Sequence, residues 1–130
     1  MLVRKILLAL ACVGVVFTAC GCAPSIVTPD AGVYSVFTLY AVTSQDLTTV
    51  YNASLKALEQ LELDITEKPK DVFYAKIVAK AANGERIIVS MKPKEDGGTN
   101  LRIRVGALGD EHRSNVIYQR IRQNLGLSEK

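Results

Sequence analysis

The chain has no tryptophan and only one histidine, His112, among its 130 residues. Histidine is the commonest metal ligand and general base in proteins, so a single imidazole argues against a His-based metal centre or catalytic dyad. The sequence also contains no Gly-x-Ser-x-Gly nucleophile motif and no phosphate-loop spacing. These absences predict a protein that is not an enzyme, with no catalytic residue, no metal site and no cofactor.

Cysteine is scarce too, and its three residues all lie within the first 22 positions. Cys20 and Cys22 are separated by one residue, and so short a gap makes a disulfide between them sterically poor. Cys12 lies in an uncharged apolar run. The chain is therefore not expected to depend on a disulfide framework.

Residues 1–19 have the pattern of an export signal. Arg4 and Lys5 form a short positive segment, and residues 6–19 follow without a charge or a proline. That run is shorter than the roughly 20 residues that span a bilayer, and it is close to the apolar core of about 7–15 residues in a secretory signal. No second long apolar run occurs, so the remainder is expected to fold outside the cytoplasm.

Residues 17–20, Phe-Thr-Ala-Cys, resemble the bacterial lipobox, in which the cysteine is diacylated and becomes the new N-terminus. Cys20 is the favoured lipid-attachment residue because Ala19 suits the position before it. Cys22 remains the alternative because residues 19–22 fit the same pattern. The resemblance predicts anchoring to a membrane through an N-terminal diacylglyceryl-cysteine.

Residues 20–32 would then be a flexible tether between the lipid and the folded domain, since glycine and proline recur there. In lipoproteins an aspartate after the acylated cysteine retains the protein in the inner membrane, and Gly21 follows Cys20 here. The resemblance therefore implies the cell envelope, at the outer membrane facing the periplasm.

The net charge of +3 comes from 16 basic and 13 acidic residues. Arg4 and Lys5 belong to the predicted leader, so its removal leaves 14 basic against 13 acidic residues and a net charge of +1. A nearly neutral chain does not favour nucleic acid as a partner.

Residues 33–128 are predicted to form a single α+β domain. β-branched and aromatic residues over 33–42 predict a first strand, with a break at Ser35 as the alternative. Apolar residues spaced by three and four then predict a helix of about 16 residues, with Thr43 as its N-cap and Asp46 completing the capping pair. Apolar and polar residues alternate in four later segments, which predict strands over residues 63–67, 73–79, 87–91 and 101–105.

Asn83-Gly84 predicts a tight hairpin, since both residues tolerate positive φ. A second helix is expected between an Asp110 N-cap and Gly126. The resulting order is β-α-β-β-β-β-α. Each helix has one apolar stripe to bury, so the economical fold is a two-layer sandwich, with an antiparallel sheet of about five strands and both helices on one face.

Three segments resemble a family of small bacterial lipoproteins known as a domain of unknown function: residues 50–61, residues 83–89 and, most specifically, residues 103–111. The resemblance implies an envelope location and an α+β fold, and it implies no activity. The layout also resembles, at the level of fold, the helix-grip lipoprotein domains of outer-membrane assembly machinery.

Strand alternation places several basic residues on the solvent face of the sheet, namely Lys76, Lys80, Arg86, Lys92, Arg102 and Arg104. Four of them, Lys76, Arg86, Arg102 and Arg104, are candidates for a face that binds an anionic partner. The plainer interpretation is that these cations keep an exposed sheet soluble and discourage edge pairing.

The sequence therefore predicts a membrane-anchored, non-catalytic envelope lipoprotein that binds an envelope protein or supports envelope assembly. The alternative is a periplasmic module that holds a small ligand or a lipid between its helices and its sheet.

Overall fold

The computed structural model describes residues 32–127. The predicted signal, both candidate lipid-attachment residues, Cys20 and Cys22, and all but the last residue of the predicted tether lie outside the described residues. The elements in chain order are β1 (Gly32–Ser35), β2 (Thr38–Thr43), α2 (Leu47–Gln60), β3 (Asp64–Glu67), β4 (Ala75–Lys80), β5 (Arg86–Pro93), β6 (Thr99–Val105) and α3 (Glu111–Asn124).

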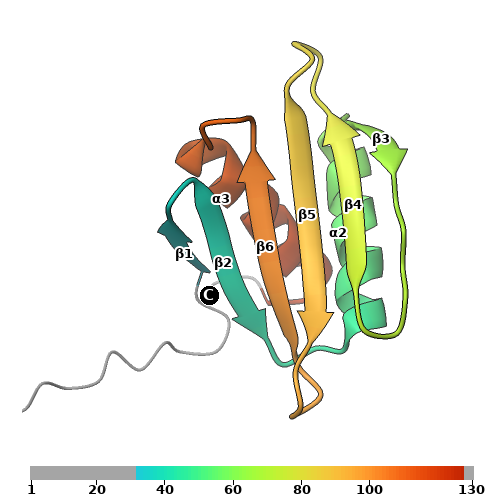
Figure 1. The fold of residues 1–130 in the computed structure, drawn as a ribbon. Coiled ribbons are helices and arrows are strands. Elements are labelled where there is room, and N and C mark those ends of the chain that lie inside the picture. The colour runs from blue at the N-terminus through green and yellow to red at the C-terminus, as the bar shows by residue number, and fades with distance from the viewer. Residues whose placement is uncertain (1–31, 128–130) are drawn as a thin grey trace, which may run out of the picture.

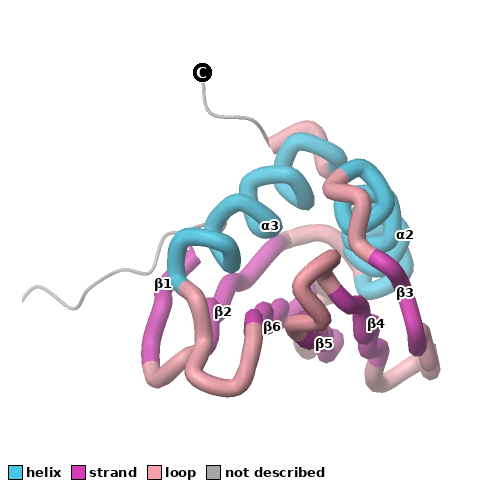
Figure 2. The backbone as a smooth tube through the Cα atoms, turned by 90° about the horizontal axis from the view of Figure 1, so that it is seen from above, coloured by secondary structure: helices cyan, strands magenta, loops and turns pink. Residues whose placement is uncertain are grey.

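The six strands form one antiparallel sheet in the order β1-β2-β6-β5-β4-β3 (Figure 1). Figure 2 shows both helices on one face of this sheet, whose two edges bend toward them. The prediction of an α+β fold with an antiparallel sheet is confirmed, with one strand more than expected. In the described part of the chain, neither helix has the length and apolar character needed to cross a membrane.

The additional strand arises within residues 33–42, which the sequence predicted as one strand with a break at Ser35 as the alternative, and β1 does end at Ser35. The structure divides this segment into β1 and β2, and Ser35 pairs with Thr38 across a two-residue turn. The turn consists of Val36 and Phe37, which are not turn-forming residues. The hydrophobic pattern therefore continued through the turn and concealed it.

The core lies between the sheet and the helices, and alternating residues of each central strand fill it. Three strands contribute Ile77 from β4, the β5 residues Ile87, Val89 and Met91, and the β6 residues Leu101, Ile103 and Val105. Leu58 of α2 and Ile121 of α3 are fully buried against them. Full burial of one such side chain stabilises the fold by about 1.5–3 kcal/mol.

The N-cap of α2 is Asp46, and the prediction of Thr43 is wrong. An Asp46 carboxylate oxygen accepts a hydrogen bond of 3.1 Å from the backbone N–H of Thr49. Thr43 ends β2 instead, and its hydroxyl accepts a bond from the Gln45 N–H. In contrast, Asp110 caps α3 as predicted, by accepting from the Arg113 N–H at 2.9 Å.

The β4–β5 hairpin forms where Asn83-Gly84 predicted it, but only Gly84 has a positive φ. The Gly84 N–H donates to the Ala81 carbonyl, and the Ala81 N–H donates to the Glu85 carbonyl. The loop is thus longer than a two-residue turn, and glycine takes its single left-handed position.

Asp46 gives α2 a pH-dependent stability. Hydrogen bonds from the side chain and the backbone N–H of Thr49 hold the pKa of Asp46 below its usual value. A carboxylate with a depressed folded pKa stabilises the fold above its unfolded pKa of about 3.9, and the effect is lost as the pH falls through the folded value. We expect the wild type to melt at a higher temperature than Asp46→Asn at about pH 6, because asparagine caps without a charge.

That difference should be smaller at about pH 2.5, because the wild-type carboxylate loses its charge progressively as the pH falls toward and through its folded pKa. Calorimetric unfolding of both proteins at the two pH values measures it. A difference that stays constant between them would contradict the role of the Asp46 charge.

Candidate functional site

The sheet face opposite the helices carries six cationic side chains. They come from three adjacent strands and are Lys76, Lys80, Arg86, Lys92, Arg102 and Arg104. Five are exposed and Lys76 is half-buried. The alternation in β4, β5 and β6 therefore sorts the residues onto the two faces as the sequence predicted, and the four candidate residues share one surface, which we call the basic face.

The strand register arranges the basic face in rows. Arg102 of β6 lies opposite Tyr40 of β2 on one side and opposite Ser90 of β5 on the other. Ser90 in turn lies opposite Lys76 of β4. One row therefore joins four strands, with a cation at the centre and another at the β4 end. The hydroxyl of Ser90 lies between them as a donor and acceptor.

Two tyrosines belong to this surface, and neither was identified from the sequence. The Arg102 guanidinium lies 5.2 Å from the centroid of the Tyr40 ring, and the Lys92 ammonium lies 6.0 Å from that of Tyr74. Contacts of this kind hold a cation above an aromatic ring. The signal for Tyr40 was weak because residues 33–42 are almost continuously apolar, which left the outward side of that strand ambiguous.

A groove of about 790 Å³ runs across the basic face. Its walls combine the two tyrosines with valine, serine, asparagine, lysine and arginine side chains. The outward-facing lining residues are Val33, Ser35, Tyr40, Val42, Tyr74, Ser90, Lys92, Asn100 and Arg102. A smaller depression of about 280 Å³ adjoins it and adds Arg104, Thr38 and Ile88. Both share Tyr40, Ser90 and Arg102, so they form one continuous surface that offers positive charge beside apolar rings.

The positive charge of the basic face is not neutralised within the described domain. None of the six cations forms an ion pair with a carboxylate among residues 32–127. Asp64 lies opposite Lys80 in the register, but it is at the β3 edge of the sheet. Arg104 donates to the carbonyl of Ala107, which holds its guanidinium at the end of β6. Because the net charge of the whole chain is only +3, six cations on one face are a local concentration of positive charge.

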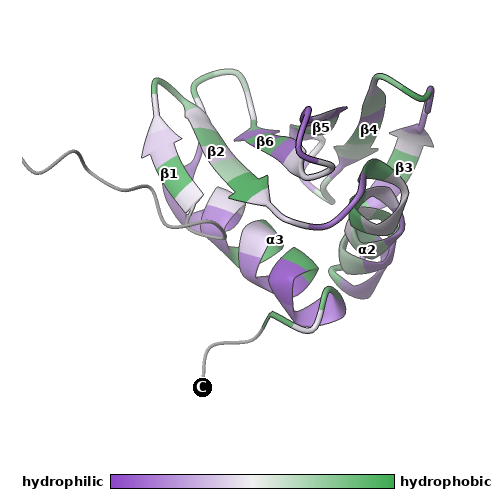
Figure 3. Ribbon diagram, turned by 90° about the horizontal axis from the view of Figure 1, so that it is seen from below, coloured by the Kyte–Doolittle hydropathy of each residue, from purple (hydrophilic) through white to green (hydrophobic). Residues whose placement is uncertain are grey.

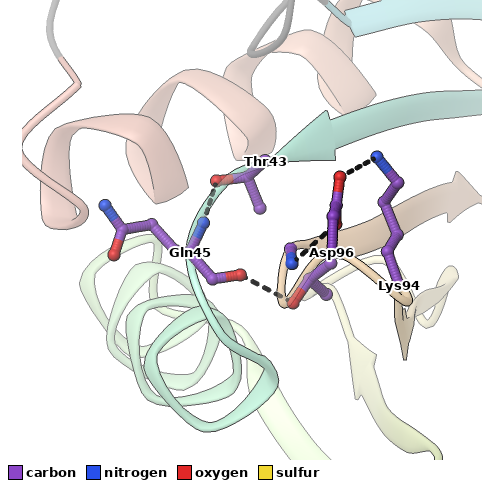
Figure 4. A network of polar contacts seen from close by, with 6 residues as sticks. Thr43, Gln45, Lys94 and Asp96 are labelled. Carbon is purple, nitrogen blue, oxygen red and sulfur yellow. Dashed lines mark hydrogen bonds and ion pairs between the residues drawn. The ribbon is translucent and has the colours of Figure 1, made fainter.

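A polar network fixes one end of the groove (Figure 4). The Thr99 hydroxyl donates to the Gln45 carbonyl at 2.8 Å, which joins β6 to the connection between β2 and α2. In the adjacent β5–β6 turn, Asp96 accepts from the Gly98 N–H at 2.9 Å and pairs with Lys94 at 3.1 Å. These contacts, the Gly98 bond first, hold the pKa of Asp96 below its usual value. The network therefore holds the neighbouring ends of the strands that carry the groove.

One protein family matches most of the chain. The family described as "Protein of unknown function (DUF3568)" matches residues 5–124. The chain belongs to the DUF3568 family. The match includes every strand and helix described above, and it confirms the resemblance to a domain of unknown function. No curated protein matches the chain.

The alternative prediction from the sequence was a ligand held between the helices and the sheet, in the interior of this DUF3568 domain. Two α3 residues, Ile117 and Ile121, fill the space between helix and sheet at 3% and 0% exposure. A depression beside α3 measures about 230 Å³ and is lined in part by His112, Arg113 and Val116. That volume lies below the range of about 300–1,000 Å³ typical of small-molecule sites. The described interior therefore favours a ligand less than the basic face does.

The acidic and histidine side chains of the DUF3568 domain do not gather into a metal site. Over residues 32–127, no group of three His, Cys, Asp or Glu residues has the arrangement that could hold an ion. His112 is exposed in the first turn of α3, and the neighbouring Asp110 is engaged in capping that helix. The part of the domain with distinctive chemistry is thus the basic face.

Proposed function

We propose that this DUF3568 protein is a membrane-anchored bacterial envelope lipoprotein, and that its basic face binds an acidic surface of an envelope protein. The observation that carries the proposal is the segregation of six unneutralised cations on the one sheet face that no helix covers. Desolvated arginine and tyrosine are the side chains that most often dominate binding energy in protein interfaces. Arg102 and Tyr40 are already in contact at the centre of this face.

The shape of the basic face supports a macromolecular partner. The groove is open along its length and extends over β1, β2, β6 and β5. Small-molecule sites usually enclose most of their ligand, whereas protein interfaces are broad and comparatively flat. Charge complementarity would guide an acidic partner to this face and accelerate the encounter. The role requires no catalytic residue.

The membrane anchor is the second part of the proposal, and it rests on residues 17–22 of the sequence. Intact-mass analysis of the mature protein tests it directly. We expect a diacylglyceryl modification that disappears in Cys20→Ala and persists in Cys22→Ala. Acylation that survives in Cys20→Ala and is lost in Cys22→Ala would move the anchor by two residues. A mature protein without any acyl group would contradict the proposed lipid anchor.

Charge reversal on the basic face should weaken the interaction strongly. We expect Arg102→Glu with Lys92→Glu to reduce partner affinity by about tenfold or more, since opposing charges become like charges at the contact. The matched control is Lys56→Glu with Arg120→Glu, which changes the net charge equally on the helix layer. Cross-linking mass spectrometry in native envelopes identifies the partner, and titration with that purified partner measures the affinity.

The same cross-linking data locate the contact on the domain. Partner cross-links should form from Lys76 and Lys92 of the basic face and should be rare from Lys56 of α2. Cross-links that concentrate on Lys56, or equal loss of affinity in the two charge-reversed proteins, would contradict the proposed interface.

A further inference from the structure

The turn between β1 and β2 has an unfavourable backbone for the residues that form it. Val36 and Phe37 have φ values of 42° and 64°. A two-residue hairpin loop with both central φ values positive normally contains Asn-Gly, because side chains with a branched or bulky Cβ are strained there. Asparagine and glycine would adopt this turn with less strain than valine and phenylalanine.

The same two side chains point into solvent. Val36 is 80% exposed and Phe37 is 49% exposed. The β6–α3 loop lies against the turn, since a Cβ added to Gly109 would lie 2.5 Å from the Phe37 carbonyl oxygen. That loop contributes Leu108, which is 78% exposed. Val36, Phe37 and Leu108 are thus exposed on two adjoining loops at one end of the sheet, here together called the apolar tip, and Figure 3 shows these two loops side by side.

Cations lie beside the apolar tip. Arg104 is held at the end of β6 by the Ala107 carbonyl, next to Leu108 in the chain. Arg86 begins β5, and its carbonyl accepts a bond from the N–H of Gly106 in the same loop. Nearby carboxylates are partly engaged: Glu85 pairs with Arg113, and Asp110 caps α3, which leaves Glu111 exposed.

We infer that the apolar tip inserts into the surface of an anionic lipid bilayer, with Arg104 and Arg86 contacting the headgroups. Exposed bulky apolar side chains gain free energy on entering the headgroup and acyl boundary, and adjacent basic residues are attracted to anionic lipids. This inference rests on the proposed lipid anchor for the membrane involved. It adds that the domain lies against that membrane in one orientation, which leaves the groove of the basic face directed along the membrane.

The predicted tether is long enough for this contact. Residues 20–31 can span at most about 40 Å when extended, and the longest strand, β5, measures about 26 Å at the usual rise per residue. The folded domain begins at Gly32, only the length of β1 from the turn. A chain anchored at Cys20 could therefore place the apolar tip at the bilayer.

Tryptophan is absent from the chain, so one substitution creates a unique fluorescent reporter. We would compare Phe37→Trp with Val72→Trp, both in the full acylated protein reconstituted into phosphatidylglycerol and phosphatidylcholine vesicles. Val72 is 74% exposed in the β3–β4 connection, at the opposite end of the sheet (Figure 1). We expect a blue-shifted emission and quenching by lipid-attached bromine for Phe37→Trp, and water-like emission for Val72→Trp.

Three outcomes would overturn the inference. Water-like emission from Phe37→Trp in an acylated protein would contradict insertion of the apolar tip, and the proposed lipid anchor would be unaffected. Equal quenching at both positions would show that the domain has no preferred orientation. A blue shift that appears with rising protein concentration and without vesicles would assign the tip to a protein contact. Quenching that persists in Cys20→Ala with Cys22→Ala when vesicles are added would support the tip contact independently of the anchor.

A second pair of proteins separates insertion from folding. In a Leu108→Trp background, Val36→Asn with Phe37→Gly supplies the residues that the turn geometry favours. We expect the unfolding midpoint to rise and the vesicle affinity to fall by about tenfold, because one Phe-sized apolar side chain accounts for about that factor. A protein that gains stability and binds vesicles as tightly as its parent would contradict the inference.

Discussion

Ile87→Ala should lower the free energy of unfolding by about 2–5 kcal/mol, whereas Ile88→Ala should lower it by about 1 kcal/mol or less. The two residues are adjacent in β5, but their side chains lie on opposite faces of the sheet. Ile87 is fully buried against the helices, so its truncation leaves a cavity in the core. Ile88 is half-buried on the basic face, where solvent can occupy the space that its side chain leaves.

Urea unfolding of the wild type and both variants measures this difference, and similar slopes would show that the unfolded states are comparable. The comparison is well matched because residue type, strand and substitution are the same. Equal losses in the two variants would mean that both sheet faces are covered. The basic face would then be unable to serve as a free binding surface.

Gly109→Ala should be the most destabilising of the glycine substitutions in the loops. Gly109 has a φ of +72°, and the added Cβ would lie 2.5 Å from both the Phe37 carbonyl oxygen and the Tyr34 hydroxyl. The left-handed backbone costs an alanine about 1–2 kcal/mol, and overpacking adds typically about 1–3 kcal/mol. We expect a total loss of about 2–5 kcal/mol.

Gly84→Ala is the control, because Gly84 has a φ of +80° with nothing within 4 Å of its added Cβ. It should lose only about 1–2 kcal/mol, from the backbone term alone. Chemical denaturation gives both values, and amide chemical shifts of Val36 and Phe37 should move in Gly109→Ala alone. If the two variants are equally stable, the β6–α3 loop does not pack on the β1–β2 turn and the apolar tip is not a single surface.

Local sequence patterns predicted the parts of the domain that depend on near neighbours. Alternation over residues 86–92 and 101–105 separated inward from outward side chains, because successive residues of a strand point to opposite faces. Asp110 and Gly126 marked the ends of α3, because capping involves groups within one helical turn. The same alternation identified the cations of the basic face without any knowledge of the strand order.

Local sequence patterns gave wrong predictions where two local structures suited the same residues equally well. Thr43 and Asp46 are both good N-caps, and the choice between them depended on how far β2 continued in its pairing with β6. The β1–β2 hairpin was missed because Val36 and Phe37 look like strand residues. Their positive φ values follow from the antiparallel pairing of the strands on either side.

The sequence by itself determined the fold class, the capping residues of α3, the glycine turns and the identity of the cations on the basic face, since each depends on residues a few positions apart. Only the tertiary structure decided which residues from distant segments become neighbours. It placed Tyr40 beside Arg102, joined β1, β2, β6 and β5 into one grooved surface, and brought Gly109 to Phe37. Those contacts arise from strand order and loop packing, which are set by burial of the whole core and not by any short segment of the chain.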